Sequence, residues 1–126
     1  MAKVLIIDDD PNILKLYSDP LTKAGYEVEM ALNGQEGLTR LFQGGYDFIL
    51  LDIMLPQMYG WEVLERIKAD ETTKHIPVIM LTARHYLEDE GETNNYARLF
   101  SGYVVKPFVV RELLDKIAGV LKGRED

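Results

Sequence analysis

The chain alternates short runs of apolar residues with longer stretches in which apolar residues recur at helical spacing. Five segments have the length and composition of strands, and they lie at 4–7, 26–31, 48–51, 78–81 and 103–105. Helical spacing follows over 11–24, 33–44, 61–67 and 113–121. A strand followed by a helical pattern, repeated along the chain, predicts a parallel, doubly wound α/β sheet with right-handed crossovers.

Local signals refine these elements. Gly25 stands where the first helix would end, and Pro20 within that helix removes one hydrogen bond and is expected to kink or shorten it. The run at 26–31 alternates apolar with charged residues, which favours a strand near the edge of the sheet. Asn33 and Glu36 have the spacing of a capping box at the start of a short helix.

Composition narrows the class of protein. The chain has 126 residues, so we expect one domain spanning 1–126. Hydrophobic residues make up 47% and charged residues 28%, which is the balance of a globular protein. The net charge of −7 argues against a nucleic-acid-binding surface, because phosphate recognition needs clustered Lys and Arg. No apolar run approaches the roughly 20 residues that span a bilayer, and cysteine is absent, so we expect a cytoplasmic protein without disulfides.

Polar side chains follow four of the five predicted strands. Asp8-Asp9-Asp10 comes after the first, Asp52 after the third, Thr82 after the fourth and Lys106 after the fifth. In open parallel sheets the functional site lies beyond the carboxyl ends of the strands, so these groups should share one rim. Clustered carboxylates favour Mg²⁺, an aspartate can act as a nucleophile, and a lysine and a hydroxyl can hold phosphoryl oxygens. The pattern indicates phosphoryl transfer.

At these positions the chain resembles the receiver domain of two-component response regulators. The matching segments are VLIIDDDP at 4–11, ILLDIMLP at 49–56 with Gly60 beyond it, VIMLTA at 78–83 and YVVKPF at 103–108. Each segment alone is a weak signal, but their ordered combination is highly specific and covers essentially the whole chain. The resemblance implies a flavodoxin-like fold with five helices and the strand order 2-1-3-4-5, for which this family is itself a standard example.

The resemblance also implies roles for the acidic residues. Asp52 corresponds to the phosphoacceptor, and Asp8 and Asp9 correspond to the acidic pair that binds Mg²⁺ together with Asp52. The backbone carbonyl of Met54 corresponds to a further metal ligand. Asp10 is not needed in this scheme, and a role in capping the following helix stays open for it.

Three further positions match the family's motif. Thr82 is expected to donate to the phosphoryl group and to shift on activation, and Lys106 is expected to pair with that group. Tyr103 corresponds to the aromatic switch residue. The peptide bond between Lys106 and Pro107 is expected to be cis, as is usual in the loop of this family.

The function implied by the resemblance is signalling. A histidine kinase or a histidine phosphotransfer protein would supply the phosphoryl group, and the domain would catalyse only its own phosphorylation and dephosphorylation. It would then signal by changing conformation toward a downstream output domain or protein. The resemblance also implies that the domain is a monomer or a weak, phosphorylation-dependent dimer.

Other classes of protein fit the sequence less well. A haloacid-dehalogenase-like phosphotransferase, with Asp8 as its nucleophile, also has Asp-x-Asp after the first strand, but it leaves Asp52 unexplained. A calcium loop could use Asp8, Asp10 and Asn12, but Ile13 stands where that loop requires glycine, and a strand precedes it instead of a helix. A nucleotide-binding module needs a glycine-rich turn after the first strand, and here that turn is acidic.

The segment between Thr82 and Lys106 departs from the family's pattern. Gly91 and Asn94-Asn95 are poor helix formers, and acidic residues cluster at 88–92, so a short, displaced or mobile fourth helix is expected. A normal helix that begins near residue 93 is the alternative. The segment ends in Leu-Phe-Ser-Gly where receivers often have a Gly-Ala-Asp-like turn. Receivers commonly dimerise or dock through this region, so the usual dimer mode is in question.

Overall fold

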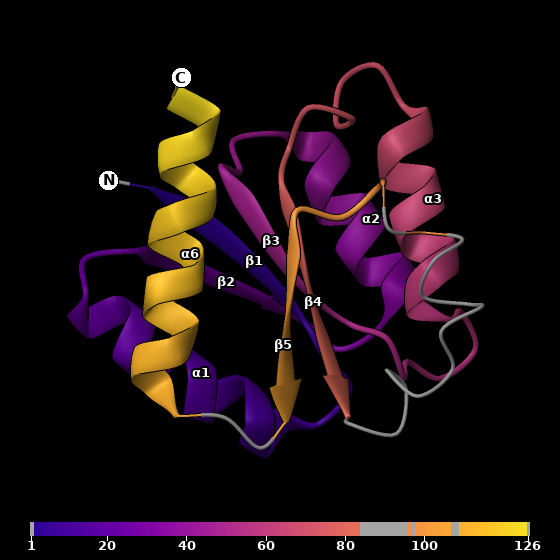
Figure 1. Ribbon diagram of the computed structural model, residues 1–126. Coiled ribbons are helices and arrows are strands. Elements are labelled where there is room, and N and C mark those ends of the chain that lie inside the picture. The colour runs from indigo at the N-terminus through magenta and orange to yellow at the C-terminus, as the bar shows by residue number, and fades with distance from the viewer. Residues whose placement is uncertain (1, 84–95, 97, 107–108, 126) are drawn as a thin grey trace.

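The computed structural model describes residues 2–83, 96, 98–106 and 109–125, and these form one five-stranded parallel sheet flanked by helices (Figure 1). The strands are β1 (Lys3–Ile7), β2 (Glu27–Ala31), β3 (Phe48–Asp52), β4 (Val78–Ala83) and β5 (Gly102–Lys106). The described helices are α1 (Pro11–Lys23), α2 (Gly34–Gln43), α3 (Gly60–Ala69) and α6 (Val110–Glu125). The strand order is β2-β1-β3-β4-β5, which confirms the predicted flavodoxin-like topology and places β2 at an edge.

The helix count differs from the expected architecture. The described residues contain four helices, whereas the family resemblance implied five. The atypical fourth helix was expected within 84–100, and most of that segment lies outside the described residues. Pro107 also lies outside them, so the expected cis peptide bond stays a prediction.

The core lies on both faces of the sheet because successive strand residues point to opposite sides. On one face, side chains such as Leu5 and Leu51 pack with α2 and α3. On the other face, side chains such as Ile6 and Leu50 pack with α1 and α6. Strands buried on both faces are the expected consequence of continuous apolar runs. The sheet is thereby held rigidly between two helical layers, and its carboxyl ends form a fixed edge (Figure 1).

Helix α1 continues past the proline that was expected to kink or shorten it, so the expected shortening is wrong. Pro20 lies in the last turn, where its missing N–H removes a single bond, and its carbonyl still accepts from the N–H of Ala24 at 3.0 Å. Leu21 and Tyr17 are buried against the sheet and hold this turn in place. Gly25 follows with a φ of 99°, a conformation that favours glycine after a helix.

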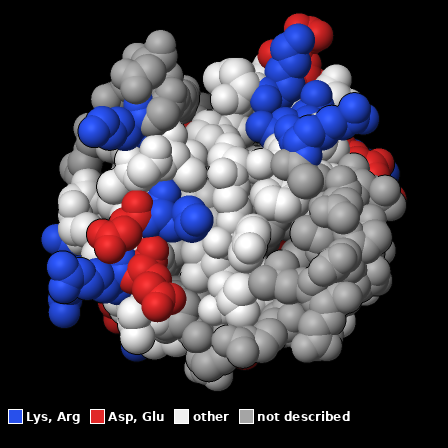
Figure 2. Space-filling model, viewed as in Figure 1, with Lys and Arg blue, Asp and Glu red and all other residues white. Residues whose placement is uncertain are grey.

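Acidic and basic side chains are mixed on the face that carries β5. Figure 2 shows Lys and Arg side chains next to Asp and Glu side chains on its left side, and a largely uncharged strip down its centre. Lys and Arg side chains also gather at its upper right, with Asp and Glu side chains beside them.

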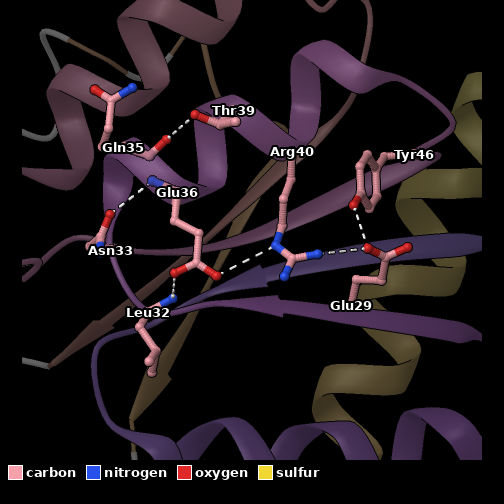
Figure 3. Close-up of polar contacts among 8 residues, drawn as sticks. All are labelled: Glu29, Leu32, Asn33, Gln35, Glu36, Thr39, Arg40 and Tyr46. Carbon is pink, nitrogen blue, oxygen red and sulfur yellow. Dashed lines mark hydrogen bonds and ion pairs between the residues drawn. The ribbon is translucent and has the colours of Figure 1, made fainter.

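Helix α2 begins with the predicted Asn33 cap, drawn in Figure 3, but Glu36 accepts from the N–H of Leu32, one residue before the cap, instead of from that of Asn33. The Asn33 side chain accepts from the N–H of Glu36 at 2.8 Å, and the Glu36 carboxylate accepts from the N–H of Leu32 at 3.3 Å. Beside this cap, Arg40 reaches from α2 to Glu29 on β2, with an Nη1–Oε1 distance of 3.0 Å. The polar contacts fasten α2 to the edge of the sheet, next to the first of the site-forming loops.

Candidate phosphoacceptor site

Three carboxylates meet at the carboxyl ends of β1 and β3. Asp8 and Asp9 follow β1, and Asp52 is the last residue of β3. The two strands are adjacent in the sheet, and carboxylate oxygens of the three residues lie within 4.8 Å of one another. Asp8 and Asp52 are only 1% and 6% exposed, whereas Asp9 is exposed. Two buried acids thus form the floor of the site and one exposed acid forms its rim.

Backbone hydrogen bonds orient the two buried carboxylates. The N–H of Asp10 donates to Asp8 Oδ1 at 3.1 Å, and the N–H of Met54 donates to Asp52 Oδ1 at 3.0 Å. Each acid therefore binds the main chain two residues ahead of it, as an aspartate in a turn commonly does. Asp10 has a separate structural role, because its own side chain caps α1 by accepting from the N–H of Asn12 at 2.9 Å.

Thr82 lies on the strand next to β3. It is on β4 and is 1% exposed, and its neighbour Leu81 pairs with Asp52 in the sheet register. The carbonyl of Leu81 accepts from the N–H of Ile53 at 3.1 Å, which fixes the two strand ends together. The last residue of β5, Lys106, pairs in register with Ala83, so its main chain ends at the same edge of the sheet. The Lys106 side chain lies outside the described atoms.

Tyr103 lies near the start of β5, away from the acid cluster. Its side chain is 43% exposed, and its ring meets the ring of Phe100 edge-on with centroids 6.4 Å apart. The structure therefore brings together Asp8, Asp9 and Asp52, and it places Thr82 on the adjacent strand. It leaves Tyr103 one strand further out, on an exposed face.

The acid cluster has the chemistry of a site for a hard cation. Two like charges about 5 Å apart repel by roughly 3 kcal/mol at an effective dielectric constant of about 20. A divalent cation offsets this repulsion, and carboxylate oxygens are the ligands that Mg²⁺ prefers. Three such oxygens within one 4.8 Å cluster, two of them on buried side chains, fit the predicted ion.

The loop from β3 to α3 contains features that sequence reasoning missed. The N–H of Met54 binds the Asp52 carboxylate, whereas only the carbonyl of Met54 was predicted to matter. Gln57 has a φ of 67°, and the N–H of Met58 donates to the carbonyl of Pro56 at 2.7 Å across it. This γ-turn is strained for a residue with a side chain. A glycine or asparagine at 57 would have signalled it, but glutamine does not.

The response regulator receiver domain model matches residues 4–118 of the chain. The chain belongs to the response regulator receiver domain family. It is a phosphoacceptor receiver domain of the two-component type, and the match gives no support to the haloacid-dehalogenase alternative. The family consists of signalling proteins, as the sequence predicted.

Individual relatives agree with the family match. The chain is 40% identical over 122 residues to the DNA-binding dual master transcriptional regulator RpaA of Synechocystis sp., covering 97% of this chain and 50% of that protein. The structure of the chemotaxis response regulator CheY4 of Vibrio cholerae is 36% identical, with a TM-score of 0.86 and coverage of 95% and 98%. Response regulator TrrA of Thermotoga maritima, determined in complex with Mg²⁺-BeF, is also 36% identical, with a TM-score of 0.83 and coverage of 95% and 99%.

The receiver domain spans about half the length of the curated relatives that it matches. The names of those relatives describe response regulators and a DNA-binding transcriptional regulator. Within the described residues, none of the helices has the length and apolar character needed to cross a bilayer.

Proposed function

We propose that Asp52 of this receiver domain accepts a phosphoryl group from a phosphohistidine, in a reaction supported by Mg²⁺ and by the domain's own residues. The observation that carries the proposal is the buried carboxylate of Asp52 at the end of β3, clustered within 4.8 Å with those of Asp8 and Asp9. A lone buried acid would be difficult to keep charged, whereas a metal-bound cluster favours the ionised nucleophile.

The chemical step is an in-line displacement. An oxygen of the Asp52 carboxylate attacks phosphorus and forms the new O–P bond while the N–P bond of phosphohistidine breaks. The imidazole leaves with the electron pair of that bond and takes up a proton. The hydrogen bond from the N–H of Met54 to Oδ1 holds the carboxylate in one orientation for the attack.

The remaining site residues would bind the transferred group. Asp8, Asp9, Asp52 and the carbonyl of Met54 would hold Mg²⁺, which supplies positive charge against the phosphoryl oxygens when bound. The Thr82 hydroxyl would donate to one phosphoryl oxygen, and the Lys106 ammonium would pair with another. Asp8 directly follows β1 and Thr82 lies on β4, the two strands to either side of β3, and both side chains are buried.

The partners follow from this chemistry. A histidine kinase or a histidine phosphotransfer protein would donate the phosphoryl group. The shift of Thr82 toward the phosphoryl group, with a rearrangement of Tyr103, would carry the signal to an output domain or a separate target protein. DNA binding appears in the name of one longer relative, RpaA. For this chain, DNA binding would require such an output partner.

Labelling with a small phosphodonor tests the acceptor. The chain is incubated with acetyl phosphate and Mg²⁺, and its intact mass is measured for the gain of one phosphoryl group. Asp52→Asn should lose the label, whereas Asp19→Asn, the same change on the exposed surface of α1, should retain it. Persistent labelling of Asp52→Asn together with loss in Asp8→Asn would assign the nucleophile to Asp8 instead.

A further inference from the structure

Four aromatic side chains form a continuous series from the start of α3 to β5. Trp61 stacks on Tyr96 with centroids 4.7 Å apart and an interplanar angle of 4°. Trp61 also contacts Phe100 at 5.9 Å, and Phe100 contacts Tyr103 at 6.4 Å with an interplanar angle of 77°. All three separations lie within the range in which aromatic rings attract one another.

Near one end of this aromatic series, Trp61 is fixed to the main chain behind the acceptor. Trp61 directly follows Gly60, whose N–H donates to the carbonyl of Ile53 at 2.9 Å. An added Cβ at Gly60 would lie 2.6 Å from the Cα of Ile53, so the two backbones are in close contact. A displacement of the chain at 52–53 cannot be absorbed by empty space there, and it would move the Trp61 backbone.

The position of the Trp61 ring depends on stacking. The indole is 3% exposed, and within the described residues its Nε1 has no hydrogen-bond partner. A buried indole usually has such a partner, which would fix the ring independently of its neighbours. Here the aromatic contacts and the surrounding core, including α2 and α3 side chains, hold the ring.

The other end of the series meets the residue that corresponds to the family's switch. Phe100 is partly buried against the core, and the next residue, Ser101, is tied to β4 by its N–H, which donates to the carbonyl of Val78 at 2.8 Å. The Phe100 ring meets the Tyr103 ring in a T-shaped arrangement, and Tyr103 is 43% exposed.

We propose that Phe100 is a positioning residue for Tyr103, and that the stacked pair Trp61–Tyr96 positions Phe100. The aromatic series holds the Tyr103 ring in its exposed resting position and gives the main chain next to Asp52 a mechanical link to it. This link runs through α3 and is separate from the route through Thr82 on β4. The proposal rests on the proposed function, because it takes Asp52 as the phosphoacceptor and Tyr103 as the switch residue.

The resting protein supplies a test that needs no phosphorylation. The full chain is labelled with 3-fluorotyrosine, and the ¹⁹F resonance of Tyr103 is assigned by its loss in Tyr103→Phe. Phe100→Leu keeps an apolar side chain but removes the ring. It should move the ¹⁹F chemical shift of Tyr103 toward that of a fully solvent-exposed tyrosine. Phe100→Tyr should restore the original position, because the aromatic contact returns. Phe42→Leu, a change on the exposed surface of α2, should leave the resonance in place.

Trp61 supplies a second readout because it is the one tryptophan of the chain. Adding Mg²⁺ and beryllofluoride to the wild type should change its emission, and Phe100→Leu should reduce that change at least twofold while acetyl phosphate still labels the variant. If Phe100→Leu shows the same Tyr103 resonance and the same change in emission as the wild type, the positioning role is overturned. Loss of labelling in the wild type would instead reject the proposed function and leave the resting-state resonance as a valid test.

Discussion

The Cα of Gly60, at the first residue of α3, lies against the main-chain carbonyl of Asp52, the last residue of β3. A side chain at residue 60 would overlap that carbonyl and come within 2.6 Å of the Cα of Ile53. Both neighbours are backbone atoms of the acceptor's own loop, so they cannot move aside as a flexible side chain could. The close approach fixes the start of α3 directly behind Asp52.

Gly60→Ala should therefore destabilise the fold by about 1–3 kcal/mol, the usual cost of forcing extra volume into a packed site. The main chain after Asp52 would have to shift, so the rate of labelling by acetyl phosphate should fall as well. Urea denaturation monitored by circular dichroism gives the free energy of unfolding.

Gly119→Ala in α6 is the matched control, because an added Cβ there meets no atom within 4 Å among the described residues. It should be neutral or stabilise by up to about 1 kcal/mol, since alanine is the better helix former. Equal stability of the two variants would contradict the close contact.

The acid cluster predicts that Mg²⁺ stabilises the folded domain. An ion that binds only the folded state raises its stability by mass action, by about 2.7 kcal/mol at one hundred times its dissociation constant. The melting temperature should rise with millimolar Mg²⁺ in the wild type and stay nearly constant in Asp9→Ala. In EDTA the variant should melt at or above the wild-type temperature, because the exposed Asp9 no longer repels Asp8 and Asp52. A wild-type midpoint that does not respond to saturating Mg²⁺ would count against the site.

The neighbouring acid should behave differently. Asp10 caps α1 through its side chain, with its Oδ1 accepting from the N–H of Asn12 at 2.9 Å, and it is outside the cluster of three carboxylates. Asp10→Ala should cost about 1 kcal/mol of stability, the typical value for a lost helix cap. The increase in melting temperature on adding Mg²⁺ should be as large as in the wild type. A smaller increase in Asp10→Ala would mean that this residue also contributes to binding the ion.

Much of the fold and the position of the site could be predicted because they depend on local patterns. The buried strands are continuous apolar runs, and the rule that strand ends carry the site was sufficient to bring Asp8, Asp9 and Asp52 together. The cap at Asn33 follows from a spacing of three residues.

Other features depend on contacts between distant residues, which the sequence does not display. The helix passes Pro20 because buried neighbours in the last turn hold it against the sheet. The positive φ of Gln57 is set by the closure of the loop onto α3. Phe100 and Trp61 are 39 positions apart in the numbering, and only the packing of α3 on the face of the sheet brings their rings to 5.9 Å. The sequence showed that the turn before β5 was unusual but could not show what its phenylalanine touches.

The polar contacts at the edge of the sheet predict a pH-dependent stability that is independent of the phosphoacceptor site. Glu29 on β2 binds Lys3 at 2.7 Å, accepts from the Tyr46 hydroxyl at 2.9 Å and pairs with Arg40 at 3.0 Å (Figure 3 shows the last two contacts). The hydrogen bond from Lys3, followed by that from Tyr46, holds the pKa of the Glu29 carboxyl below its ordinary value. A carboxyl whose pKa is lower in the folded state stabilises that state above the unfolded pKa, and the stabilisation is lost as the pH falls through the folded pKa.

Glu29→Gln should therefore have a lower melting temperature than the wild type at pH 7. This gap in melting temperature should narrow as the pH falls below about 4.3, the ordinary pKa of glutamate. Raising the salt concentration at pH 7 should narrow the gap as well, because the pairs are partly exposed. Glu65→Gln is the control, since Glu65 is exposed on α3 and has no ion pair within the described residues. Its melting temperature should follow that of the wild type at every pH, and a Glu29→Gln gap of the same size at pH 7 and pH 3 would contradict the assigned cause.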